Sequence, residues 1–301
     1  MPRRSFVLLI ASLAVTLTCV VPVFSAASAA VNAGTGQPAA KQYYLALGDS
    51  LATGEQPNQD ANQGYANQLD AQLRSHGRVL SLDDLGCAGE TTWTFIHGGI
   101  CGYPDGPGMG DQLGAAVDFL RAYPGQVPLI TIDIGGNDLN DCDGLSSVSA
   151  AGACGKSLIP GMSRNLTAIL KALRAADPSA VITGLNYYVP QVAYWLDGAA
   201  GRSLATAQIS VTKSMNAALA ADYKAATAGY ADVFSEFESD DLTDMTTLPG
   251  YGSVPVAVAL VCEWTWMCAA PPEGGDDHAN QEGYGAIAAA IYAVLPASMA
   301  T

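Results

Sequence analysis

Short apolar runs alternate with longer segments of helical periodicity along most of this chain. Three runs rich in Ile, Leu, Val and Tyr are typical of buried parallel strands, and they span Tyr43–Leu47, Pro128–Ile134 and Ala180–Leu185. Val79–Leu85 and Ala231–Phe237 are two further strand candidates. Strands that alternate with helices predict a parallel sheet covered on both faces, which is an α/β fold.

Helical segments are recognised by apolar residues that recur three or four positions apart. In the first of them, Tyr65, Leu69 and Leu73 lie on one face. The predicted helices span Gly64–Ser75, Gln112–Arg121, Ile159–Ala175, Ala205–Ala226 and Gln281–Leu295. We expect two long segments, Gly86–Gly110 and Ser239–Gly275, to be irregular, and the second is the natural candidate for a lid.

The amino-terminal segment has the composition of a secretory signal peptide. Two arginines precede an apolar run from Phe6 to Val23, and small residues follow it up to Ala30. This order predicts a signal peptide at 1–30 that is cleaved after Ala29 or Ala30. A retained transmembrane anchor is the alternative.

The remaining chain is long enough for one domain with a sizeable core. Residues 31–41, rich in Gly, Ala, Gln and Pro, are expected to form a flexible lead-in to a single domain at 42–301. Without residues 1–30 the chain keeps 11 Lys and Arg against 28 Asp and Glu, a net charge of −17. This charge argues against nucleic acids and anionic membrane surfaces as partners. We expect a secreted monomer with no membrane anchor after processing.

Six cysteines remain after removal of the signal peptide, and an even number in an exported chain predicts disulfides. They fall in three close pairs, which favours the pairings Cys87–Cys101, Cys142–Cys154 and Cys262–Cys268. A zinc site is the rival interpretation. It is disfavoured because no pair has Cys-x-x-Cys spacing.

Candidate chemistry begins at the end of the first strand, where the turn Gly48-Asp49-Ser50 has a serine at its tip. A serine hydroxyl is a poor nucleophile until a base takes its proton. His278 is the candidate base because carboxylates precede it directly, and Asp276 is the candidate that fixes its tautomer. A serine, a histidine and an acid that meet only on folding are typical of a hydrolase.

Acyl transfer also needs N–H donors for the oxyanion. The Ser50 backbone N–H is one candidate, and the Asn137 side chain is a second, because Asn137 follows the strand Pro128–Ile134 and so lies on the same rim of the sheet. Gly89 is a third candidate, since glycine allows a tight turn that brings a backbone N–H close.

Together these motifs resemble the four sequence blocks of the GDSL/SGNH hydrolases, in the order of that family. The blocks are Gly48-Asp49-Ser50-Leu51, the glycine at Gly89, Gly135-Gly136-Asn137-Asp138 and Asp276-Asp277-His278. The resemblance extends from Tyr43 to about Leu295. The three close cysteine pairs resemble those of secreted actinobacterial lipases and esterases.

The resemblance implies a flavodoxin-like three-layer α/β/α sandwich with a central parallel sheet. It implies that small-molecule or lipid carboxylic esters are hydrolysed through an acyl-enzyme, without a metal or another cofactor. It also implies that Ser50, Gly89 and Asn137 form the oxyanion hole. Two alternatives stay open: an acetylated polysaccharide or a phospholipid as substrate, and a binding module without turnover.

The sequence departs from the family pattern in the last block. The family has its aspartate three residues before the histidine, where this chain has Gly275. Asp276 and Asp277 follow one and two residues later. A main-chain carbonyl that orients the histidine is therefore an alternative to Asp276.

Overall fold

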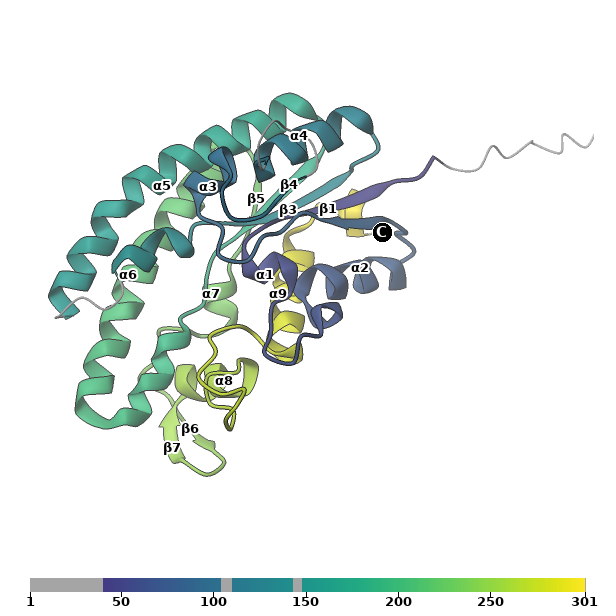
Figure 1. Ribbon diagram of the computed structural model, residues 1–301. Helices are drawn as coiled ribbons and strands as arrows, with labels where there is room; N and C mark the ends of the chain where they lie inside the picture. The colour runs from purple at the N-terminus through teal and green to yellow at the C-terminus, as the bar shows by residue number, and fades with distance from the viewer. Residues whose placement is uncertain (1–39, 104–109, 143–147, 301) are drawn as a thin grey trace, which may run out of the picture. The chain divides into compact units, whose positions relative to one another are not determined.

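The computed structural model describes residues 40–103, 110–142 and 148–300. A five-stranded sheet, in which each neighbouring pair is parallel, lies at the centre of this part of the chain (Figure 1). Its strands are β1 (Tyr43–Gly48), β2 (Ser81–Asp84), β3 (Leu129–Asp133), β4 (Val181–Leu185) and β5 (Gly229–Ala231). The expected signal peptide 1–30 and nearly all of the lead-in 31–41 lie outside the described residues.

Helices cover both faces of the sheet. The longer ones are α2 (Tyr65–Ser75), α4 (Gln112–Ala122), α5 (Val148–Ala176), α6 (Gly198–Ala225), α8 (Val256–Trp264) and α9 (Gln281–Val294). The shorter helices and 3₁₀ segments are α1 (Ser50–Thr53), η1 (Ala61–Gln63), α3 (Thr92–His97), η2 (Asn137–Cys142), η3 (Pro190–Asp197), α7 (Val233–Glu236) and α10 (Ala297–Ala300).

Alternation along β1 shows how the two faces are filled. Tyr44 and Ala46 belong to one buried apolar cluster, which α2 and α9 complete. Leu45 and Leu47 point to the other face and pack in a second cluster with α4, α5 and α6. Figure 1 shows α4 and α5 on one side of the sheet and α2 and α9 on the other. The three-layer α/β/α sandwich predicted from the sequence is therefore confirmed.

The strand order is β2-β1-β3-β4-β5. This is the flavodoxin-like order, in which the chain moves outward on both sides from β1. The direction in which successive strands are added to the sheet reverses between β1 and β3. Ligands of such sheets bind outside the carboxyl ends of the strands at this switch point. Ser50 follows the end of β1 after a single residue, Asp49, and the segment that begins at Gly135 follows β3. Two of the predicted blocks therefore lie at the switch point.

One strand prediction was wrong over most of its length. Ala231–Phe237 was expected to be a strand, but β5 ends at Ala231 and α7 follows it. Asp232 explains the change, because its side chain accepts a hydrogen bond from the N–H of Ser235 and so caps the helix.

Two segments expected to be irregular contain regular structure. Gly86–Gly110 includes α3, which begins with a capping box between Thr91 and Thr94. Ser239–Gly275 contains α8 and the antiparallel hairpin of β6 (Met245–Leu248) and β7 (Gly252–Pro255). In addition, α5 begins at Val148, well before the predicted start at Ile159.

The three predicted disulfides are present in the structure: Cys87–Cys101, Cys142–Cys154 and Cys262–Cys268. The third joins the end of α8 to the loop that leads to His278. Within the described residues, no helix combines the length and the apolar character needed to cross a membrane.

Candidate active site

The turn that carries Ser50 is fixed by contacts at the end of β1. Gly48 has a φ of +137°, and a Cβ atom added there would lie 2.1 Å from the main-chain oxygen of Asp133. The Gln112 side chain donates to the Gly48 oxygen at 2.9 Å and accepts from the Gly48 nitrogen at 2.7 Å. Only glycine allows β1 to approach β3 this closely before the chain turns into α1.

Asp49 is the N-cap of α1, and its side chain accepts from the N–H of Leu51 at 3.0 Å. Ser50 is therefore the first residue of the helix, where a backbone N–H has no intrahelical partner. The Tyr187 hydroxyl donates to the second oxygen of Asp49 at 2.6 Å. Burial raises the pKa of Asp49, although both hydrogen bonds act in the opposite direction.

His278 is oriented by the aspartate that the sequence analysis selected. Oδ1 of Asp276 lies 2.9 Å from Nδ1 of His278 and also accepts from the His278 backbone N–H at 2.9 Å. The nearest oxygen of Asp277 is 3.6 Å from Nδ1. Gly275 has a φ of +85°, a conformation in which an aspartate would be strained. The chain therefore turns at Gly275 and supplies its carboxylate one residue later.

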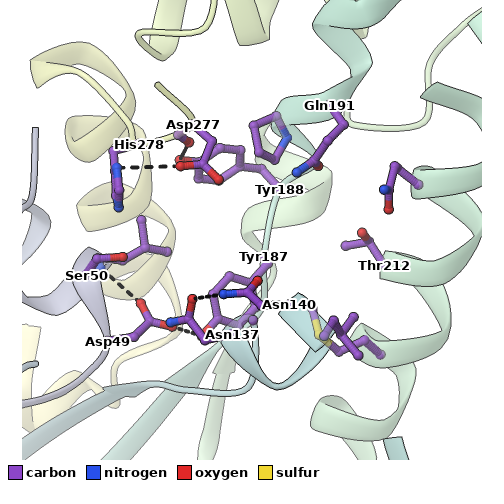
Figure 2. Close-up of a pocket in the computed structure, with 16 residues that line it drawn as sticks. Asp49, Ser50, Asn137, Asn140, Tyr187, Tyr188, Gln191, Thr212, Asp277 and His278 are labelled. Atoms are coloured by element: carbon purple, nitrogen blue, oxygen red, sulfur yellow. Dashed lines mark hydrogen bonds and ion pairs between the residues drawn. The ribbon is translucent and has the colours of Figure 1, made fainter. Parts of the chain in front are cut away.

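Ser50 and His278 line the same cavity. Figure 2 shows both side chains at one end of it and Thr212 at the other. Among the hydrogen bonds of the described residues, none joins the Ser50 hydroxyl to the His278 ring. On the Nε2 side of the ring, Oε2 of Glu55 lies 3.8 Å away. Glu55 belongs to no motif, so no pattern in the sequence selects it.

Asn137 also lines this cavity, at the start of η2. Its Nδ2 donates to the main-chain oxygen of Glu90 at 3.0 Å, and its Oδ1 accepts from Asn140 at 3.0 Å. One amide hydrogen is thus used to hold the side chain, and the second is left for a ligand. The contact with Glu90 links the third sequence block to the turn of the second.

Gly89 lies in that turn, with a φ of +80° and an exposed surface. The N–H of Glu90 donates to the oxygen of Cys87 at 3.0 Å, which closes the turn. Gly89 is outside the set of residues that line the cavity. Gly89 precedes Glu90, whose main-chain oxygen accepts from Asn137, but Gly89 itself does not contribute to the cavity wall.

Asp138 has a different task from its neighbour Asn137. It accepts from the backbone N–H of Thr92 at 2.7 Å and from the Thr92 hydroxyl at 2.5 Å. These contacts join η2 to the start of α3, and burial raises the pKa of Asp138. Asp138 therefore holds η2 against α3.

The cavity has a volume of about 170 Å³. Tyr187 and Tyr188 form part of its wall. Its far side is formed by residues of η3 and α6, which no motif predicted: Pro190, Gln191, Gln208, Thr212 and Met215.

One group of side chains in the described ranges has the spacing of metal ligands, namely Asp276, Asp277 and His278. Their closeness follows from consecutive positions and from the contact that orients the imidazole. The group therefore gives no separate support for a metal site.

A family model identifies the chain. The model of the GDSL-like lipase/acylhydrolase family matches residues 46–286, which is most of the sequence. The chain belongs to this family. It is accordingly a carboxylic ester hydrolase, and the predicted resemblance to the GDSL/SGNH hydrolases is confirmed.

Solved structures of low sequence identity share the fold of this family member. Phospholipase A1 from Streptomyces albidoflavus is 19% identical, with a TM-score of 0.56, over 85% of this chain and 100% of that one. An extracellular lipase from Streptomyces rimosus is 18% identical, with a TM-score of 0.56, over 84% and 100%. A lipase from a goat rumen metagenome is 15% identical, with a TM-score of 0.58, over 84% and 97%. No curated protein matches the sequence.

Proposed function

We propose that this protein is a secreted serine esterase or lipase that works through an acyl-enzyme formed on Ser50. The observation that carries this proposal is the imidazole of His278, which is oriented by Asp276 at 2.9 Å and lines one cavity with Ser50. An imidazole held at Nδ1 by a carboxylate presents Nε2 as the base.

In the first half of the reaction, the Ser50 oxygen attacks the ester carbonyl carbon while Nε2 of His278 takes the hydroxyl proton. The tetrahedral intermediate then collapses, and the same proton passes to the leaving alcohol. In the second half, water loses a proton to Nε2 and attacks the acyl carbon, and Ser50 recovers its proton as the acid leaves. Asp276 stabilises the imidazolium in both halves.

The oxyanion is proposed to accept hydrogen bonds from the N–H of Ser50 and from the amide of Asn137, which both line the cavity. The N–H of Gly89, outside the cavity lining, stays the third predicted donor. Asn137 has one amide hydrogen available, because the other is donated to Glu90. The Ser50 N–H is available because it begins α1. Removal of one such donor typically lowers kcat by about 10²–10³-fold.

Secretion is supported by the predicted signal peptide and by three disulfides, which persist in oxidising compartments. The phospholipase A1 and the extracellular lipase that share the fold come from Streptomyces. They support an exported lipolytic enzyme, with phospholipids among the candidate substrates.

A small ester of a hydroxylated alcohol, such as an acetylated sugar, is a second candidate substrate. The cavity of about 170 Å³ is near the size of one that holds a benzene ring, about 150 Å³. Gln191, Gln208 and Thr212 line its far side, and their side chains make no hydrogen bond with other described residues. These groups are available to the hydroxyls of a polar ligand.

A panel of p-nitrophenyl esters, with acyl chains from acetyl to palmitoyl, and acetylated xylan tests the proposal. Ser50→Ala and His278→Ala are expected to abolish turnover of every substrate while the folded state is kept, as judged by circular dichroism. Turnover retained by folded Ser50→Ala would refute the acyl-enzyme on Ser50. A wild-type chain without esterase activity would instead support the binding-module alternative.

A further inference from the structure

We propose that Asp49 and Asp133 hold a single proton between them, and that this shared proton keeps the turn of Ser50 in its active geometry. Asp133 is then a positioning residue for the nucleophile, although it lies in none of the sequence blocks. The inference rests on the proposed role of Ser50, and it adds a pH-sensitive support beneath that residue.

Asp133 is the last residue of β3, and its side chain is fully buried. Its Oδ2 accepts from the backbone N–H of Asp49 at 3.1 Å and from that of Ala52 at 3.2 Å. Its Oδ1 accepts from the Tyr65 hydroxyl. The carboxyl group of Asp133 thus binds the backbone on both sides of Ser50, so that any movement of this carboxyl is transmitted to the serine.

Asp49 completes the arrangement from within the turn. It is 1% exposed, and its two oxygens are engaged by the N–H of Leu51 and the hydroxyl of Tyr187. Both carboxyl groups are therefore surrounded by neutral donors. In the described part of the chain, no Lys or Arg forms an ion pair with either of them.

Among the other titratable groups that surround Asp49 and Asp133 in the described residues, His278 is the one that can carry a positive charge. These groups are Tyr44, Tyr65, Tyr187, Tyr188, Tyr223, Tyr284, Glu90, Asp138 and His278. Phenols and carboxyl groups add no positive charge, and His278 is neutral when it acts as a base. Two buried carboxylates without a cation cannot both be ionised at low energy, so one of them keeps its proton.

The proton belongs mainly to Asp133. Burial raises the pKa of Asp133 well above its usual range, and the charge of Asp49 together with a hydrogen bond between the two side chains raises it further. Burial also raises the pKa of Asp49, but the hydrogen bond from Asp133 lowers it. With one proton the pair carries a single negative charge, which the surrounding donors stabilise.

Loss of the proton at alkaline pH has a defined consequence. Two buried negative charges then repel one another across the backbone of Ser50, and the turn is displaced. We expect the reactivity of Ser50 to fall reversibly as the pH rises through the raised pKa of Asp133.

The test follows Ser50 reactivity, as the rate of labelling by a fluorophosphonate probe, from about pH 5 to about pH 10. The wild type is expected to lose reactivity reversibly at the alkaline end. Asp133→Asn, which keeps the size and an acceptor oxygen but cannot ionise, is expected to remove this alkaline loss. Asp133→Leu, which removes the acceptors of both N–H groups, is expected to lower kcat by about 10–100-fold with little change in KM.

Asp177→Asn is the matched control. Asp177 is also a buried aspartate whose Oδ1 accepts from two backbone N–H groups, those of Ser179 and Ala180, but it lies before β4, away from the cavity. Its substitution is expected to leave the alkaline loss unchanged. If Asp133→Asn does not fold, Asp49→Asn reports on the same proton, because it also leaves one ionisable carboxyl group.

An alkaline loss that persists unchanged in folded Asp133→Asn or Asp49→Asn would overturn the inference. A wild-type profile without a reversible alkaline loss would overturn it as well. In both cases labelling of Ser50 at neutral pH leaves the proposed function intact. Absence of labelling in the wild type at every pH would instead contradict the proposed function.

Discussion

At the scale of single residues, the orientation of His278 depends mainly on Asp276. One oxygen of Asp276 contacts both the ring Nδ1 and the backbone N–H of the same histidine. Asp277 is further from the ring, and 59% of its side chain is exposed. The two neighbouring carboxylates are therefore unequal, and substitution can separate them.

Asp276→Asn is expected to lower kcat by about 10–10⁴-fold, because the amide favours the wrong imidazole tautomer. Asp277→Asn, the matched variant, is expected to change kcat by less than about threefold, since its charge is largely screened by solvent. Steady-state kinetics on p-nitrophenyl acetate measures both. No loss in Asp276→Asn would favour a main-chain carbonyl as the orienting group, and equal losses in the two variants would contradict the unequal roles of the two carboxylates.

Sequence alone identified the residues of the site that sit in short motifs. Ser50, Asn137, Asp276 and His278 were selected in this way, and the first, second and fourth line one cavity. Asp133 was not selected, because its contacts with the Ser50 turn arise only when β1 and β3 pair.

At the scale of elements, the close approach of β1 and β3 determines where Ser50 lies. Gly48 pairs with Asp133 in the register of these strands. The absence of a side chain at Gly48 allows this contact, and its positive φ turns the chain toward α1. A change at this one position therefore affects both the sheet and the site.

Gly48→Ala is expected to lower the free energy of unfolding by about 2–5 kcal/mol, because the new methyl adds a clash to a strained conformation. Gly77→Ala is the control: Gly77 has a φ of +86°, but an added Cβ meets nothing within 4 Å. It should lower the free energy of unfolding by only about 1–2 kcal/mol. Denaturation in urea measures both, and equal losses would contradict the role of the strand contact.

Strong periodicity predicted the major elements, and short elements were missed for specific reasons. The strands around Leu45 and Ile132 and the helix around Leu69 were predicted correctly because apolar runs and spacing are unambiguous there. Asp232 ends β5 by capping α7, a local signal that an apolar run conceals. α8 is apolar without a marked period, because most of its surface is buried.

At the scale of the whole molecule, the proposed site forms because segments distant in the sequence converge. The alternation of strands and helices was sufficient to predict a parallel sheet, and the resemblance supplied its flavodoxin-like order. The far wall of the cavity, from η3 and α6, could not be predicted, because Gln191, Gln208 and Thr212 belong to no motif. We expect substrate preference to depend on these residues, which sequence patterns describe least.

The most direct test of the central claim is mass spectrometry of the folded wild-type protein after reaction with a fluorophosphonate. We predict one covalent adduct, on the peptide that contains Ser50, and loss of that adduct in His278→Ala. An adduct on a different serine, or undiminished labelling of Ser50 in folded His278→Ala, would contradict the claim that these two residues act together.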